Sequence, residues 1–176
     1  ISRAARRADF PAQFQLIAAM NPCPCGYLGS SQKTCRCSSD QVARYQGKIS
    51  GPLLDRLDLH LEVHSLPTQD LLTLPAGEAS SAIAQRVAAA QNRALARQGC
   101  LNAQLGAQAL QEQAKLDTPA QRFLTSTAEH LGWSARATHR VLKLARSIAD
   151  LAGEAAISSA HVAEAVQYRR ALRLLQ

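Results

Sequence analysis

The stretch SARATHRVLKLARSIADL, residues 134 to 151, predicts a helix with one apolar face. Its aliphatic residues recur at spacings of three and four, which is the period of one side of an α-helix. Ser134 offers a hydroxyl that caps the first turn, and Gly153 suits the left-handed backbone that ends many helices. The side chains expected on the apolar face are Ala137, Val141, Leu144, Ala145 and Ile148. We therefore expect this helix to pack against other helices along that face.

Further helix signals follow a predicted linker. Residues 65–78 contain two prolines and a glycine, which is typical of a linker, and helical patterns begin at residue 79. Three more helices are expected, and the first covers residues 80–98 and ends before Gly99. The second begins at the cap Thr118, has Pro119 at its first position and ends at Gly132. The third runs from the cap Ser158 to about Leu174. We therefore expect residues 101–176 to form an all-α domain.

The first 67 residues have a mixed pattern that indicates an α/β structure. The run FQLIAAM, residues 14–20, is largely apolar and predicts a strand buried on both faces. Pro22 cannot donate a hydrogen bond to a neighbouring strand, so this strand should end at Asn21. Open α/β sheets bind ligands at the carboxyl ends of their strands, although an Asn there also commonly begins a turn. The alternating run LDLHLEV, residues 57–63, predicts a second, half-buried strand.

Charge and composition limit the partners and the compartment. The 176 residues carry a net charge of +7, which suits an anionic partner such as a nucleotide or nucleic acid but also simple solubility. No apolar stretch approaches the ~20 residues that span a bilayer. The basic residues 1–10 are not followed by the apolar region of a signal peptide. We therefore expect a cytoplasmic protein without a membrane partner. Ile1 is not a natural first residue, so we expect the chain to be part of a longer protein.

Four of the five cysteines fall in one loop, as CPC at Cys23 and Cys25 and CRC at Cys35 and Cys37. Without a secretory signal, a disulfide framework is not expected. Four thiolates in one loop can bind Zn²⁺ in a tetrahedral structural site, although the common spacing is C-x₂-C or longer. The alternative is a reduced surface loop that binds no metal. The sequence favours a zinc site in which Cys100 takes no part.

Two arginines stand at positions that suit contact with a phosphate. Arg56 follows Asp55 in GPLLDRLDL, and it either forms an exposed ion pair or reaches a phosphate on another subunit. Arg136 lies in the first turn of the helix capped by Ser134, where the helix dipole favours anions over cations. It is either a solvated side chain or a residue that meets an anion brought to the same helix end.

Three strings together resemble the second half of an AAA+ ATPase module of the magnesium-chelatase-like group, in its ComM (YifB-like) bacterial branch. They are FPAQFQLIAAMNPCPCGY, ISGPLLDRLDLHLEV and SARATHRVLKLARSIADL, and the resemblance runs from Ile1 to about Arg170. It implies that Asn21 is sensor 1 at the end of a core strand and that Arg136 is sensor 2 on the lid, both in contact with nucleotide. It also implies that Arg56 is an arginine finger acting in trans. The cysteine loop resembles a feature of this branch rather than of the chelatase subunits.

The same resemblance implies a domain order. Residues 1–67 would be the C-terminal part of an αβα ATPase core with a cysteine-rich insert at 22–40, followed by a linker and connecting helix at 68–100 and a helical lid at 101–176. The chain contains no GxxxxGK[ST] phosphate loop, so we expect no ATP hydrolysis by the chain alone. The full-length parent is expected to bind ATP and Mg²⁺.

For the parent, the resemblance implies a hexameric ring that uses ATP to remodel DNA, as a branch-migration helicase in natural transformation. One alternative is the ATPase subunit of a magnesium chelatase. The cysteine loop argues against it, because Mg²⁺ prefers hard oxygen ligands over thiolates. The other alternative is a zinc-stabilised helical interaction module without ATPase ancestry.

Overall fold

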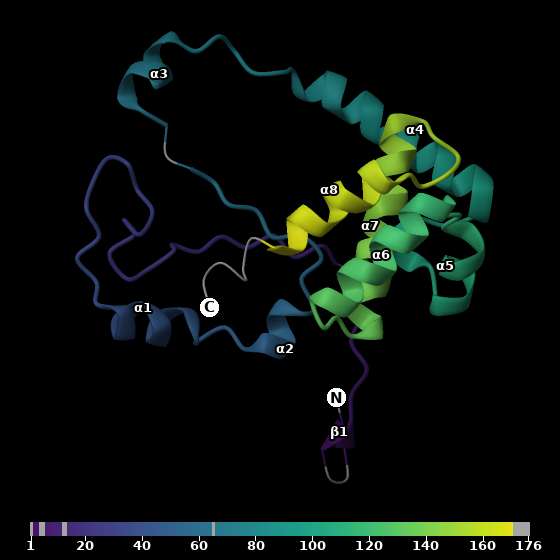
Figure 1. Cartoon of the computed structure of the whole chain (residues 1–176), viewed down its shortest axis with the longest axis horizontal. Coiled ribbons are helices and arrows are strands. Elements are labelled where there is room, and N and C mark those ends of the chain that lie inside the picture. Colours follow the sequence, from purple (N-terminus) through teal and green to yellow (C-terminus); the bar gives the residue numbers. More distant parts are fainter. Residues whose placement is uncertain (1, 4–5, 12–13, 65, 171–176) are drawn as a thin grey trace. The chain divides into compact units, whose positions relative to one another are not determined.

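The computed structural model describes residues 2–3, 6–11, 14–64 and 66–170, and the chain divides into two compact units, 1–45 and 46–176. The first unit contains the antiparallel strands β1 (Ser2–Arg3) and β2 (Arg6–Arg7) and most of α1 (Ser39–Gln46). The elements of the second unit, shown in Figure 1, are α2 (Gly51–Leu54), α3 (Thr68–Thr73), α4 (Ser80–Gln98), the 3-10 turn η1 (Asn102–Gln104), α5 (Ala107–Gln113), α6 (Thr118–His130), α7 (Ala135–Ala152) and α8 (Ser159–Arg170). Among the described residues, no helix combines the length and the apolar character needed to cross a membrane.

The two predicted core strands are not present in the part of the chain that the structure describes. Residues 14–20 and 57–63 form no strand, and apolar side chains in both runs are exposed, with Val63 at 90%. A strand needs a neighbour whose backbone completes its hydrogen bonds. Among the described residues, strand pairing is limited to β1 with β2 and a bridge between Leu116 and Ile157. The partial α/β core is therefore not seen, and the described chain is mostly helical.

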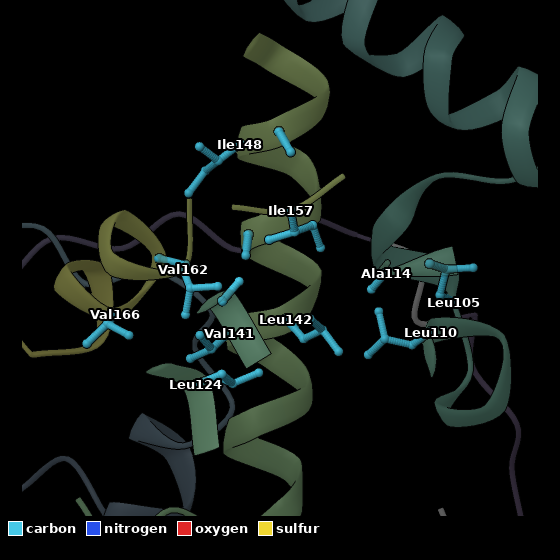
Figure 2. Packing of buried hydrophobic residues seen from close by; sticks show 14 residues of the cluster. Leu105, Leu110, Ala114, Leu124, Val141, Leu142, Ile148, Ile157, Val162 and Val166 are labelled. Atoms are coloured by element: carbon cyan, nitrogen blue, oxygen red, sulfur yellow. The ribbon is translucent and has the colours of Figure 1, made fainter. Parts of the chain in front are cut away.

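Helices α4 to α8 pack together, and we call them the helical unit. Helix α7 lies at its centre, as its sequence pattern predicts. It packs against α4, α5, α8 and η1, while α6 packs against α8. Of the five residues expected on its apolar face, four are buried and Leu144 is partly buried. Figure 2 shows side chains of this core on both sides of α7, including Leu105, Leu110, Leu124, Leu142, Ile157, Val162 and Val166. The apolar stripe of α7 therefore lies inside the core.

The helix ends follow the predicted capping signals, with one correction. The Ser134 hydroxyl accepts a hydrogen bond from the backbone N–H three residues later at 3.2 Å, and Gly153 ends α7 with a φ of 80°. At the start of α6 the cap is Asp117 rather than Thr118. The reason is that the Asp117 carboxylate accepts a hydrogen bond from the Ala120 N–H at 2.7 Å, which satisfies a donor of the first turn.

Other boundaries agree with the predicted ranges except in the linker. Helix α4 ends at Gly99 as expected, whereas the short helix α3 forms inside the predicted linker, directly after Pro67. Helix α8 begins just after Ser158, whose backbone N–H donates to His161 Nδ1 at 3.1 Å. The expected end of this helix near Leu174 lies outside the described residues.

A buried carboxylate joins α4 and η1 to α7. Asp150 and Arg146 are both buried on α7, with Arg146 Nη2 3.0 Å from Asp150 Oδ1. From α4, Arg97 donates to the two carboxylate oxygens of Asp150 at 2.6 and 2.9 Å. Asn102 of η1 donates to Asp150 Oδ2 at 2.8 Å, and Arg93 of α4 donates to the Asp150 backbone carbonyl at 2.8 Å. This one residue therefore connects three elements of the unit.

The surroundings of Asp150 keep it charged at neutral pH. Burial alone would raise the pKa of its carboxyl group, because a buried charge loses its hydration. Hydrogen bonds from Arg97 and Asn102 and the positive charge of Arg146 outweigh burial and hold this pKa below its ordinary value. Because the pKa is lowered by folding, the stabilisation is present above the pKa of an unfolded Asp, about 3.9. This stabilisation is lost as the pH falls through the lowered pKa of Asp150 in the folded protein.

We predict that Asp150→Asn lowers the free energy of unfolding of the 176-residue chain by about 3 kcal/mol at pH 7. The substitution leaves the guanidinium groups of Arg97 and Arg146 without the charge that compensates their burial. Urea unfolding followed by circular dichroism measures the loss. The difference from wild type should shrink as the pH is lowered below the pKa of an unfolded Asp.

The matched control is Glu78→Gln, which removes the exposed ion pair between Glu78 and Arg86 at the start of α4. We expect it to change stability by less than about 1 kcal/mol, because both partners are well hydrated. Equal losses in the two variants would show that Asp150 has no special role.

Candidate functional site

The cysteine loop brings the four predicted thiols together. The Sγ atoms of Cys23, Cys25, Cys35 and Cys37 all lie within 4.8 Å of one another. Cys25 Sγ and Cys35 Sγ are 3.5 Å apart, and Cys23 Sγ lies 3.4 and 3.7 Å from them, respectively. Gly26, with a φ of 80°, closes a tight turn in which its N–H donates to the Cys23 carbonyl at 3.0 Å. This turn folds the CPC pair back onto the CRC pair.

The geometry of these sulfurs fits a tetrahedral Zn²⁺ site. Four sulfurs bound to zinc at about 2.3 Å lie about 3.8 Å from one another. The separations of 3.4, 3.5 and 3.7 Å are close to that edge length. The unusual C-x-C spacing is compatible with such a site, because Cys23 and Cys25 span one edge of the tetrahedron. Cys100 is not part of the cluster and packs beside the helical core instead.

The thiols also influence one another's protonation. Backbone hydrogen bonds from Arg36 and Tyr27 stabilise the Cys25 thiolate and lower its pKa to about 6. A backbone hydrogen bond from Cys25 acts in the same direction on Cys37, but burial and the neighbouring thiols outweigh it and raise the pKa of Cys37 to about 12. Four adjacent thiolates repel one another and need a cation among them. A metal bound by all four would supply that charge and would have no open coordination position, as in structural rather than catalytic sites.

The second candidate site is the segment after α2 that carries Arg56. Ser50 caps α2 with its hydroxyl 3.4 Å from the Leu53 N–H, and Pro52 lies in the first turn. The Arg56 side chain is exposed, and its Nη1 donates to the Pro52 carbonyl at 2.7 Å. The ion pairs described in the structure do not include Arg56, so its charge is available to an anion.

The acidic residues on both sides of Arg56 are bound by the C-terminal helices. Arg169 of α8 donates to the Asp55 carboxylate at 3.3 Å, so Asp55 does not pair with Arg56. Arg140 of α7 forms an ion pair with Asp58. Sequence reasoning did not identify these two ion pairs. The paired residues are 114 and 82 positions apart, respectively, and no local pattern marks such distant partners.

Asn21 and Arg136 belong to different units. Arg136 is exposed in the first turn of α7, as predicted. Asn21 is exposed just before the cysteine loop. Its side chain lies beside Gly26, since a Cβ added to Gly26 would be 3.6 Å from Asn21 Nδ2. The two units, divided between residues 45 and 46, are each described separately. The convergence of Asn21 and Arg136 on one nucleotide therefore stays a prediction, as does the contact of Arg56 with the nucleotide of a neighbouring subunit.

Two family models match the chain. The model described as magnesium chelatase, subunit ChlI C-terminal, matches residues 77–169, and the model described as magnesium chelatase, subunit ChlI, matches residues 1–71. The first match covers the helical unit from α4 to α8. The chain therefore belongs to the magnesium chelatase ChlI family, which confirms the resemblance found in its sequence.

Similar proteins align with the chain over almost all its length. It is 44% identical over 178 residues to competence protein ComM of Haemophilus influenzae, in an alignment of 100% of this chain with 34% of that protein. It is 43% and 44% identical over 177 residues to the YifB proteins of Escherichia coli and Salmonella typhimurium, with 99% of this chain and 34% of each relative aligned. The chain thus spans about a third of the length of the curated relatives it matches.

Proposed function

We propose that the full-length protein is a ring-forming AAA+ ATPase in which Arg56 of one subunit completes the ATP site of the next. The observation that carries this proposal is the exposed Arg56 side chain, whose flanking acids are paired with other arginines. An arginine supplied by a neighbour stabilises charge on the γ-phosphate and raises the rate of hydrolysis by about 10³–10⁵-fold. Head-to-tail contacts of this kind close into a ring when the rotation between subunits permits it. The family resemblance favours a hexamer.

Asn21 and Arg136 have separate roles in this proposal. ATP with Mg²⁺ provides the phosphoryl group that is transferred to water. Asn21, as sensor 1, orients the attacking water or contacts the γ-phosphate. Arg136, as sensor 2, lets the helical lid distinguish bound ATP from bound ADP, because the two nucleotides contact it differently. The division into core (1–67), connecting segment (68–100) and lid (101–176) belongs to the same proposal.

Two exposed apolar runs support incorporation into a larger ATPase core. Ile17 and other apolar side chains of residues 14–20 are exposed, as are Leu61 and Val63 in residues 57–63. Such extended segments become stable as strands only when neighbours cover and pair with them. The relatives are much longer than this chain, which aligns with 34% of them. We propose that the rest of the protein supplies these neighbours and that both runs become strands of an αβα core.

We propose DNA as the molecule that ATP hydrolysis remodels, by branch migration. One relative is named a competence protein, and the net charge of +7 suits a polyanion. The second candidate function is the ATPase subunit of a magnesium chelatase, which the names of the family models favour. The thiol cluster argues for the first candidate, because a site for Mg²⁺ uses oxygen ligands.

We also propose that the four clustered cysteines bind one structural Zn²⁺. Sulfur separations close to a tetrahedral edge support this assignment. Within residues 22–40 the buried residue is Cys23, so the loop has little apolar core to hold it. The free energy of metal binding would then order the loop in place of hydrophobic burial.

For Arg56 we predict that Arg56→Ala in the full-length protein lowers kcat for ATP hydrolysis by at least about 10³-fold. The Kd for ATP should change little, because Arg56 contacts nucleotide bound to the neighbouring subunit. Steady-state hydrolysis and equilibrium nucleotide binding measure the two effects. Arg122→Ala, at an exposed arginine of α6, is the control and should leave both values unchanged.

Mixing tests whether this effect acts in trans. Arg56→Ala subunits mixed with subunits that lack the phosphate-loop lysine should regain some activity, since an intact ATP site then meets an intact arginine. If mixed rings form and remain inactive, Arg56 does not act across the interface.

For Arg136 we predict that Arg136→Ala uncouples hydrolysis from DNA remodelling in the full-length protein. The amount of DNA strand exchanged per ATP hydrolysed should fall by about fivefold or more, because the lid loses its contact with the γ-phosphate. Parallel measurements of strand exchange and phosphate release give this ratio. An unchanged ratio would remove Arg136 from the sensor role.

For the cysteine cluster we predict that the 176-residue chain, purified under reducing conditions without chelator, contains one zinc per molecule. Replacing Cys35 and Cys37 together with Ser should release the metal and make residues 22–40 sensitive to proteases, while the helical unit keeps its circular dichroism spectrum. Cys100→Ser is the control and should retain full zinc content. Elemental analysis that finds no zinc in the unsubstituted chain would contradict the proposal.

A further inference from the structure

We propose that Arg140 and Arg169 are positioning residues that hold residues 55–58, the Arg56 segment, against the helical unit. Movement of α7 and α8 would then move the arginine that this segment presents to the neighbouring subunit. This inference rests on the proposed role of Arg56 and adds a regulatory connection to it. Four residues form the contact, which we call the arginine clasp: Asp55, Asp58, Arg140 and Arg169.

One half of the clasp lies on α7. Arg140 is only 24% exposed and pairs with Asp58, which is 66% exposed. Arg140 follows Arg136 by one helical turn, so both side chains start from the same part of one helix. A rotation or shift of this end of α7 therefore displaces Asp58 together with Arg136. Asp58 lies two residues beyond Arg56, and a displacement of one moves the other.

The other half of the clasp lies near the end of α8. The side chain of Arg169 is 7% exposed, and it donates to the Asp55 carboxylate at 3.3 Å and to the Leu57 carbonyl at 3.1 Å. The adjacent residue, Tyr168, accepts a hydrogen bond from the backbone N–H of His60 at 2.7 Å. Main-chain and side-chain groups on both sides of Arg56 are thus bound to one helix. This arrangement limits the positions that Arg56 can reach.

The clasp also determines which charge the segment presents. Asp55 is next to Arg56, and an unpaired carboxylate there would compete for the guanidinium or repel the neighbour's phosphate. Arg169 and Arg140 neutralise the two acids, while Arg56 itself contacts the Pro52 carbonyl of its own turn. The Arg56 guanidinium at the centre of the segment therefore remains available to a phosphate of the neighbouring subunit. An isolated exposed ion pair contributes little, but here a nearly buried arginine and main-chain bonds act together.

The helices that carry the clasp are packed into one core. Helices α7 and α8 share the apolar core, in which Val141, Val162 and Val166 are buried. Close-packed helices shift together rather than deform. A change at the N-terminal end of α7, where Arg136 is expected to meet nucleotide, would thus reach Arg56 through the clasp. The ATP state of one subunit would then set the activity of its neighbour.

Charge exchange in the full-length protein tests this inference. Arg140→Glu and Asp58→Arg should each lower kcat for ATP hydrolysis by about tenfold with the KM for ATP changed less than about twofold, because the ATP-binding residues remain intact. The double variant restores the opposite charges and should recover most of kcat. Rescue by exchange would show that the effect depends on the ion pair between Arg140 and Asp58. Misfolding would instead change the KM for ATP together with kcat. The control Arg86→Glu breaks the exposed pair between Arg86 of α4 and Glu78, which precedes the helix, and should leave kcat unchanged.

Mixed rings separate an effect on the neighbour from an effect on the same subunit. Arg140→Glu subunits have intact ATP sites but a misplaced Arg56, so adding subunits that lack the phosphate-loop lysine should raise their activity. Failure of that rescue, or of the double variant, would overturn the inference. Asp58 is mostly exposed, so Asp58→Arg should fold even if a change at Arg140 does not. Full activity in Arg56→Ala would instead overturn the proposed function. If Arg56→Ala is inactive while Asp58→Arg is fully active, only the proposed role of the arginine clasp is overturned.

Discussion

The helical unit depends on the Asp150 carboxylate, which lies between Arg97 of α4 and Arg146 of α7. Removing two charged partners from water costs free energy, and the contact is favourable only when the geometry is good and further hydrogen bonds satisfy the carboxylate oxygens. Here both oxygens of Asp150 accept two hydrogen bonds each, from Arg97, Arg146 and Asn102. Because these bonds are directional, they fix how α4 and η1 lie on α7, which apolar packing alone would leave less defined.

Helix α7 makes long-range polar contacts near both of its ends. Near its C-terminal end Asp150 binds α4 and η1, and near its N-terminal end Arg140 binds Asp58 of the Arg56 segment. Between them the apolar face of the same helix lies in the core. A helix held at both ends and along its apolar face has few ways to move except as a whole. In the proposed ATPase ring, Arg136 and Arg140 at its N-terminal end would connect the nucleotide to the arginine offered to the next subunit.

Several local features could be predicted from the sequence because their causes are local. The spacing of apolar residues in α7 identified its buried face, and Ser134 and Gly153 marked its ends. The cluster of four cysteine sulfurs was also expected, since two close pairs in a glycine-containing loop have few ways to lie apart. The cap of α6 was placed one residue late, because Asp117 and Thr118 both have suitable oxygens and only the backbone geometry selects one. The expected strands at 14–20 and 57–63 did not form, since strand pairing depends on neighbours that a run of residues does not contain.

The sequence by itself determined the four long helices α4, α6, α7 and α8, the apolar face of α7, the thiol set and the presence of an arginine at position 56. Each of these depends on residues a few positions apart. Only the tertiary structure decided which charges meet. The pairs Arg97–Asp150, Arg140–Asp58 and Arg169–Asp55 join residues 53, 82 and 114 positions apart, respectively. An arginine can pair with any acid that the fold brings near it, so neither residue type nor local spacing identifies the partner. The packing of α4, α7 and α8 makes that choice, and with it leaves Arg56 as the exposed cation of its segment.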